Sequence, residues 1–317
     1  MSKHNKPPKP LLWNETGIDF HPQVSTRDMK HSVSTTAAMP FYYASFVGVW
    51  VYWLTDLDKV KPHFDRGEGD FRPYVFMDDD DNEKALVAIN FQTYTDHAGM
   101  ALGVVNEVEF NICAYPTADE RRVPRGLSVD QFLMGIDQTK RIGLFRIHVP
   151  ADNTIAVAAG KAFFGEPKFF AQFNYTVPAF NNQAQKTWEI NVYDENEPNP
   201  MNPENDHHLL FSMHVPELDM APRYANTSPL ALYTYVKDES TGEDIPNGSH
   251  WQMLLPMAHY HPLPPDVVSE LTITAGGSQV EHMADDIRTL IGDQPAVAVQ
   301  VFRSNPACIE GAAYDVR

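Results

Sequence analysis

The 317-residue sequence has little cysteine and little positive charge. Its two cysteines, Cys113 and Cys308, are too few for a disulfide framework, and both lie in apolar, strand-like surroundings that favour buried free thiols. Lysine and arginine number 24 against 42 aspartates and glutamates, which gives a formal net charge of −18. So acidic a chain is a poor candidate for binding nucleic acid or an anionic membrane. These features favour a soluble protein whose partner is a small molecule.

The first residues lack a long hydrophobic run. Basic residues occur within the first ten positions, but no apolar segment follows them, so we expect neither a signal peptide nor a membrane anchor and favour a cytoplasmic location. Residues 1–38 are interrupted by Pro and His and predict an extended arm, of a kind that often lies on a neighbouring subunit. We therefore expect a homo-oligomer. Residues 39–317 contain no linker-like stretch and predict a single domain, for which 43% hydrophobic residues supply a sizeable core.

Clusters that would suggest a metal site are present but weak. The four acids of Asp78–Asp81 lack an ordered ligand spacing and are typical of a solvated turn. Adjacent histidines such as His207 and His208 point to opposite faces of a strand, whereas His259 and His261 share a face but have no third ligand at a supporting spacing. We therefore expect no metal and no cofactor.

Strand patterns dominate the rest of the chain. Phe41–Leu54 has the aromatic and β-branched content of a buried strand, and Thr55-Asp56 follows it as a cap for a short helix. Further strand patterns cover residues 72–77, 85–94, 144–149, 187–193, 208–215, 230–236, 251–257, 270–275 and 296–302. Helical spacing occurs at residues 128–140 and, as the one helical segment after residue 168, at residues 281–291. The pattern predicts an α+β fold that is mainly antiparallel β with a few short helices.

The most informative stretch runs from small, apolar residues into one lysine, Lys168. Residues 155–164 predict a packed helix or turn in which Gly160 allows close backbone approach, and Pro167 then ends the helix and a strand begins. A lysine that opens a strand usually extends its ammonium group to water. Alternatively, burial would lower the pKa of Lys168, and a neutral amine can attack a ketone to form an imine.

A second stretch places two carboxylates on one face of a strand. The alternation of residues 104–112 puts Glu107 and Glu109 on one side and apolar residues such as Val108 and Phe110 on the other. A solvated edge strand would explain this pattern. The alternative is a pair of pocket carboxylates that could transfer protons.

The two stretches resemble the acetoacetate decarboxylase family. The resemblance is carried by Gly160-Lys161 followed by Phe164-Gly-Glu-Pro-Lys168, and by Leu102-Gly-Val-Val-Asn-Glu107 after the turn at Asp96–Gly99. It spans most of residues 40–310 and implies a barrel-like fold of the acetoacetate decarboxylase type. It also implies that Lys168 forms a Schiff base with the substrate and that Glu107 is the pocket carboxylate. Phe46, Asn90, Phe164 and Phe169 are the residues that it implies for the substrate pocket.

The sequence departs from the family at three of these positions. Phe169 replaces a second lysine, Asn90 replaces a second acid, and Phe46 falls near the position of an arginine associated with the substrate carboxylate. Burial alone would then have to lower the pKa of Lys168. We expect a Schiff-base lyase that acts on a keto acid or ketone, with decarboxylation of a β-keto acid as its reaction. An aldolase or dehydratase using the same imine, and a non-catalytic β-barrel that binds a small ligand, are the alternatives.

Overall fold

The computed structural model describes residues 41–65, 69–96, 103–178, 184–194, 208–238, 241–304, 308–310 and 313–316. The predicted arm, residues 1–38, lies outside this part of the chain. The longer strands are β1 (Phe41–Asp56), β4 (Glu83–Asp96), β5 (Val104–Pro116), β6 (Gly143–Ala151), β7 (Lys168–Thr176), β8 (Trp188–Asp194), β9 (Leu209–Val215), β11 (Leu230–Lys237), β12 (Asp244–Met253) and β15 (Ala296–Ser304). Shorter strands are β2 (Phe71–Pro73), β3 (Val75–Met77), β10 (Arg223–Ala225), β13 (Met257–Tyr260), β14 (Thr272–Ala275), β16 (Cys308–Glu310) and β17 (Tyr314–Asp315).

The helices are few and short, as the sequence predicts. They are α1 (Leu57–Val60), α2 (Val129–Leu133), α3 (Thr154–Ala159), α4 (Pro265–Glu270) and α5 (Met283–Leu290). A π-helical turn, Gly160–Phe164, directly extends α3. None of the described helices has the length and apolar character needed to cross a membrane. The α+β, mainly antiparallel fold class is confirmed.

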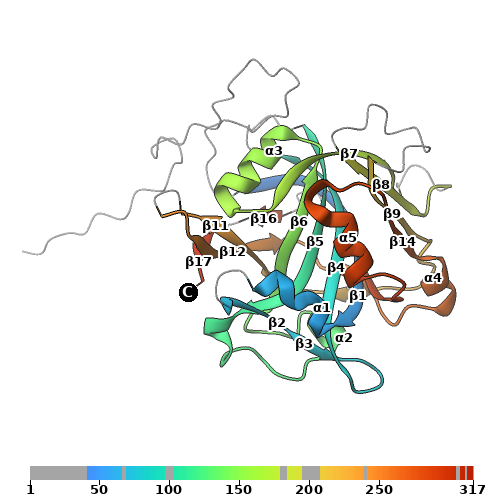
Figure 1. Cartoon of the computed structure of the whole chain (residues 1–317). Coiled ribbons are helices and arrows are strands. Elements are labelled where there is room, and N and C mark those ends of the chain that lie inside the picture. Colours follow the sequence, from blue (N-terminus) through green and yellow to red (C-terminus); the bar gives the residue numbers. More distant parts are fainter. Residues whose placement is uncertain are drawn as a thin grey trace, which may run out of the picture.

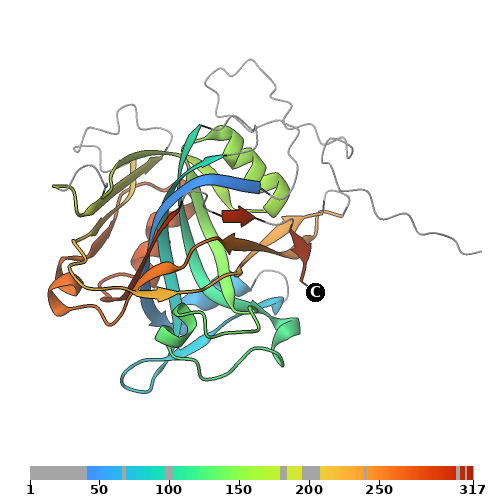
Figure 2. The same cartoon turned by 180° about the vertical axis from the view of Figure 1, so that it is seen from behind.

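The strands form a barrel-like sheet with a second sheet beside it (Figures 1 and 2). In the barrel-like sheet β1, β4, β5 and β6 pair antiparallel in that order, β6 pairs parallel with β11, and β11 pairs antiparallel with β12. The short strand β16 pairs with both β12 and β1. β6 also pairs parallel with β7, from which β8, β9 and β14 continue as the second sheet.

Side-chain alternation gives the barrel-like sheet two different faces. On β1, Val49 and Val51 belong to one hydrophobic cluster, while Phe46 and Trp50 belong to another on the opposite face. On β5, Val108 and Phe110 join the first cluster, and Glu107 and Glu109 lie on the other face, which is the interior of the barrel-like sheet. Glu107 and Glu109 are 2% and 0% exposed, so the solvated-edge interpretation of this strand is wrong.

Three local predictions differ from the structure. The helix predicted over residues 128–140 ends at Leu133, because Gly135 follows with a positive φ of 80°, although the capping box of Ser128 and Gln131 is present. The strand predicted over residues 251–257 is broken into β12 and β13 around Pro256, which has no N–H to donate to a ladder. Residues 281–291 are not the one helical segment after Lys168, since α4 begins at Pro265, where proline suits the first turn of a helix.

Candidate active site

Lys168 is positioned by the short helical segment that precedes it. Asn153 caps α3 by accepting hydrogen bonds from the backbone N–H groups of residues 155 and 156. The π-helical turn ends at Gly165, whose φ of 68° is in the left-handed region that favours glycine. Gly160 has a different role: a Cβ atom there would lie 2.1 Å from Glu166 Oε2 and 2.5 Å from Lys168 Cδ. Glycine at position 160 therefore leaves the space into which both side chains fold.

The Lys168 side chain enters the interior of the barrel-like sheet, and not the solvent. The residue is 5% exposed, and its Nζ atom lies 2.6 Å from Glu107 Oε2 and 2.9 Å from Glu166 Oε2. The interpretation of Lys168 as a strand-opening lysine that reaches water is therefore wrong. Two sequence-distant segments, β5 and the start of β7, bring a lysine amine and a carboxylate into direct contact.

Eight interior side chains form a closed circuit of polar contacts, which we call the polar ring. In order they are Lys168, Glu107, Gln92, Asn90, Asn111, Glu109, Arg146 and Glu166, with neighbours 2.6–3.5 Å apart. The hydroxyl of Tyr94 also donates to Glu107 Oε2 at 2.9 Å. Each charged member therefore has at least one partner of opposite charge, which offsets part of the cost of burying it.

The protonation state of Lys168 differs from the sequence-based expectation. Burial alone would lower the pKa of its amine, as we expected, but the carboxylates of Glu107 and Glu166 outweigh burial and raise the pKa above its usual value. The prediction of a neutral amine in the free protein is therefore wrong, because it considered desolvation without the two nearby acids. The free protein holds Lys168 as an ammonium ion.

The polar ring contains more acidic groups than basic ones. Within the ring, Glu107, Glu109 and Glu166 face two cations, Lys168 and Arg146. Burial raises the pKa of Glu107, and it raises the pKa of Glu109 to about 7 against the opposing effect of Arg146. The pKa of Glu166 is lowered, since Lys168 and Arg146 together outweigh its burial. The ring therefore favours a protonated carboxyl group as pH falls to about 7, and both Glu107 and Glu109 contribute to this preference.

This surplus acid predicts a pH-dependent stability. The pKa of Glu109 is higher in the folded than in the unfolded protein, so the folded state binds the extra proton and stability falls as pH rises from about 4.5 to about 7. We expect Glu109→Gln to remove up to about 3 kcal/mol of this fall, because glutamine does not titrate. Urea unfolding of both proteins between pH 5 and pH 8 measures the difference. Parallel pH profiles for the two proteins would contradict this assignment.

The structure places the four predicted pocket residues in different surroundings. Asn90 belongs to the polar ring, and Phe46 stacks on Tyr94 with ring centroids 6.0 Å apart. Phe169 packs in the hydrophobic cluster on the opposite side of its strand from Lys168, since adjacent strand residues point to opposite faces. Phe164 packs against residues 41 and 163 at the end of the π-helical turn. Phe46 and Asn90 thus lie beside the Lys168 site, and the side chains of Phe164 and Phe169 pack elsewhere.

Sequence reasoning missed two charged members of the polar ring. Arg146 lies between apolar residues on β6, donates to Glu166 Oε1 at 2.6 Å, and has its guanidinium group 5.6 Å from the ring centre of Trp251. Glu166 stands directly before Pro167, which ends the helix. An arginine flanked by the apolar residues Phe145 and Ile147 was the available signal for Arg146. The sequence carried no comparable signal for Glu166, because its inward direction depends on the turn at Gly165.

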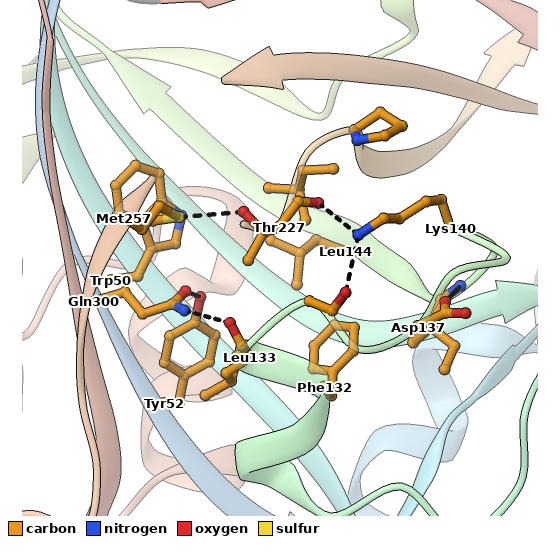
Figure 3. A pocket seen from close by; sticks show the side chains of 14 residues that line it. Trp50, Tyr52, Phe132, Leu133, Asp137, Lys140, Leu144, Thr227, Met257 and Gln300 are labelled. Carbon is orange, nitrogen blue, oxygen red and sulfur yellow. Dashed lines mark hydrogen bonds between the residues drawn. The ribbon is translucent and has the colours of Figure 1, made fainter. Parts of the chain in front are cut away.

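A small cavity lies further along the same interior (Figure 3). Its walls include Trp50, Tyr52, Leu144, Met257 and Gln300, and its free volume is about 20 Å³. That volume is enough for about one water molecule or a group of similar size. Among the described residues, no three His, Cys, Asp or Glu side chains come together in a way that could hold a metal ion.

Comparison with known proteins identifies the fold. No family model matches the sequence, and no curated protein matches it. Solved structures do match: acetoacetate decarboxylase from Legionella pneumophila subsp. pneumophila str. Philadelphia 1 has a TM-score of 0.58 at 9% identity, covering 92% of this chain and 93% of that one. The enduracididine biosynthesis enzyme MppR complexed with pyruvate has a TM-score of 0.57 at 12% identity, covering 92% and 97%. The chain has the acetoacetate decarboxylase-like fold.

A further match concerns the same enzyme with another ligand. MppR complexed with the condensation product of pyruvate and imidazole 4-carboxaldehyde has a TM-score of 0.54 at 12% identity, covering 91% of this chain and 95% of that one. At these identities the likeness establishes the fold alone.

Proposed function

We propose that this protein is a Schiff-base lyase in which Lys168 forms an imine with a small ketone or keto acid. The observation that carries the proposal is the Lys168 amine, buried inside the sheet between the carboxylates of Glu107 and Glu166 at 2.6 and 2.9 Å. Solved structures with this fold include acetoacetate decarboxylase and an enzyme complexed with pyruvate, which supports a small carbonyl compound as substrate.

In the first step Lys168 must lose a proton, because only the neutral amine attacks a carbonyl. Glu107 is the proton acceptor, since its carboxylate is 2.6 Å from Nζ and its raised pKa reduces the energy needed for the transfer. Attack by the amine gives a carbinolamine, and the proton on Glu107 then leaves with the hydroxyl group as water. The product is an iminium ion, whose positive charge lies beside the carboxylate of Glu166.

The iminium ion can accept an electron pair from either of two broken bonds. In decarboxylation the bond from the α-carbon to the carboxylate breaks and CO2 leaves. In a retro-aldol reaction the bond to a hydroxyl-bearing carbon breaks, and the hydroxyl proton moves to a carboxylate as a new carbonyl forms. In both cases a proton then adds to the enamine carbon, and water releases the ketone from Lys168.

Decarboxylation of a β-keto acid is the reaction that the sequence resemblance favours, and aldol-type chemistry is the second candidate. A specific observation supports the second: both interior cations of the polar ring already contact carboxylates, Arg146 with Glu109 and Glu166, and Lys168 with Glu107 and Glu166. CO2 release from acetoacetate would establish decarboxylation, whereas a new C–C bond or loss of water would establish the second reaction.

Glu107→Gln tests the proton transfers without removing the amine. We expect the variant still to give a borohydride-trapped adduct after long incubation, because Lys168 is present and Glu166, 2.9 Å from its amine, can accept the proton. Turnover should fall roughly 10²- to 10⁴-fold, the usual contribution of a general acid–base group. Intact-mass measurement after borohydride and a steady-state assay check the two parts. Glu83→Gln, which changes an exposed residue on β4, is the matched control and should behave as the unaltered protein. Undiminished turnover in Glu107→Gln would remove Glu107 from the mechanism.

A further inference from the structure

The cavity of Figure 3 has one polar group without a partner among the side chains that line it. Tyr52 donates to Gln300, Gln300 to the carbonyl of Leu133, Lys140 to the carbonyls of residues 135 and 227, and Thr227 to the sulfur of Met257, while Asp137 accepts from residue 139. Among the residues that the structure describes, the indole N–H of Trp50 has no hydrogen-bond partner, although Trp50 is 0% exposed. A buried, unsatisfied donor is costly, so its presence in a cavity wall suggests a ligand that accepts this hydrogen bond.

The Trp50 cavity is next to the Lys168 site. Trp50 opposes Asn90 across the β1–β4 ladder, and Gly48, two residues before it, opposes Gln92. Two residues along a strand span about 6.6 Å. Trp50 therefore lies one row of side chains away from Gln92 and Glu107. The Phe46 ring lies between the two regions. Its centroid is 6.0 Å from the ring centroid of Tyr94 and 6.0 Å from that of Trp50. The length of a substrate of about four carbon atoms is comparable to this separation, so its distal end would reach Trp50 if the Phe46 side chain moves aside.

The charges around Lys168 and the Trp50 cavity favour a substrate whose end near Trp50 is uncharged. Lys168 and Arg146 already face three carboxylates, so a substrate carboxylate would add a fourth buried anion to two cations. Two charged side chains, Lys140 and Asp137, also line the cavity, but Lys140 already donates to the carbonyls of residues 135 and 227 and interacts with the charge of Asp137. The donor without a partner there is the neutral indole N–H, and the free volume of about 20 Å³ suits a hydroxyl-sized group.

Resting on the proposed imine chemistry, we propose that Trp50 determines substrate specificity by donating its indole N–H to an uncharged oxygen, a hydroxyl or carbonyl, on the substrate's distal end. The substrate class is then a small hydroxy-ketone or similar uncharged carbonyl compound. This class fits the aldol and dehydration reactions, in which a β-hydroxy ketone is substrate or product, better than it fits decarboxylation.

Three ketones with a common acetyl end test this proposal. They are 4-hydroxy-2-butanone, with a distal hydroxyl; 2-pentanone, with a methyl group in its place; and acetoacetate, with a carboxylate. We expect borohydride to trap 4-hydroxy-2-butanone on the protein about tenfold faster than either of the others, the equivalent of one net hydrogen bond. Trp50→Phe should remove this tenfold preference by slowing the trapping of 4-hydroxy-2-butanone to the rate found with 2-pentanone in the same variant. Trp53→Phe, on the opposite face of the same strand, is the matched control and should keep the preference.

The outcomes distinguish this inference from the proposed function. Faster trapping of acetoacetate, or an equal effect of Trp50→Phe on both ketones, would overturn the role of Trp50 while the imine chemistry stands. If no ketone is trapped, the proposed function fails. The binding site can still be tested by NMR, using the indole N–H signal of Trp50, which is assigned by its loss in Trp50→Phe. We expect this signal to shift with 4-hydroxy-2-butanone and not with 2-pentanone. An unchanged signal with both ketones would reject the site.

Discussion

Replacing Lys168 with arginine is expected to abolish borohydride trapping and to lower turnover by roughly a thousandfold or more. The guanidinium group keeps the positive charge that Glu107 and Glu166 need, but it does not lose a proton and cannot form an imine. The charge-retaining change is preferable to Lys168→Ala, which would leave two buried carboxylates near each other without the amine between them. Intact mass after reduction and steady-state rates measure the two effects.

A matched control uses a second lysine of the same segment. Lys161 lies in the π-helical turn seven residues earlier and is exposed, so Lys161→Arg should retain the adduct and the turnover of the unaltered protein. The chemical role of Lys168 would be contradicted by an adduct that persists in Lys168→Arg while circular dichroism shows the variant to be folded. A non-catalytic ligand-binding β-barrel would then be the better interpretation.

Replacing Arg146 with methionine is expected to lower the free energy of unfolding by about 3–5 kcal/mol at pH 8. The change removes the cation between Glu109 and Glu166 and leaves Lys168 alone against three buried carboxyl groups. The loss should be smaller at pH 5, because Glu109, whose pKa is raised to about 7, then carries a proton and no longer needs the guanidinium group. Urea denaturation at the two pH values measures both the loss and its pH dependence.

An exposed ion pair provides the comparison for Arg146. Arg72 contacts Glu120 at 3.3 Å, with side chains 52% and 43% exposed, so Arg72→Met should cost less than about 1 kcal/mol at either pH. Equal losses in Arg72→Met and Arg146→Met would show that the polar ring does not depend on its arginine. A loss in Arg146→Met that is independent of pH would instead contradict the protonation assigned to Glu109.

The sequence predicted the β-rich fold and the contact between Lys168 and Glu107 better than it predicted the chemical state of that contact. The alternation on β5 indicated which face carries Glu107, and the run from Gly160 to Lys168 indicated the junction that positions the amine. The alternation of side chains along a strand and the glycine and proline residues of a turn determine both features locally. They can therefore be recognised without a structure.

The rest of the site depends on contacts between distant segments. Arg146 and Glu166 come from β6 and from a turn whose direction requires the left-handed conformation at Gly165. The predicted direction of the pKa shift of Lys168 was wrong because it weighed burial alone, whereas the carboxylates of Glu107 and Glu166 outweigh burial. The same limitation applies to Trp50, whose unpaired N–H is apparent only when all of its neighbours are known.

The most direct test of the central claim is to locate the covalent label. The unaltered protein is incubated with 4-hydroxy-2-butanone or acetoacetate, reduced with borohydride, digested, and examined by peptide mass spectrometry. We predict one adduct per chain, on the peptide that contains Lys168 and at the Lys168 side chain itself. A label spread over exposed lysines such as Lys161, or no label with any ketone or keto acid of a panel that includes pyruvate, would contradict the account.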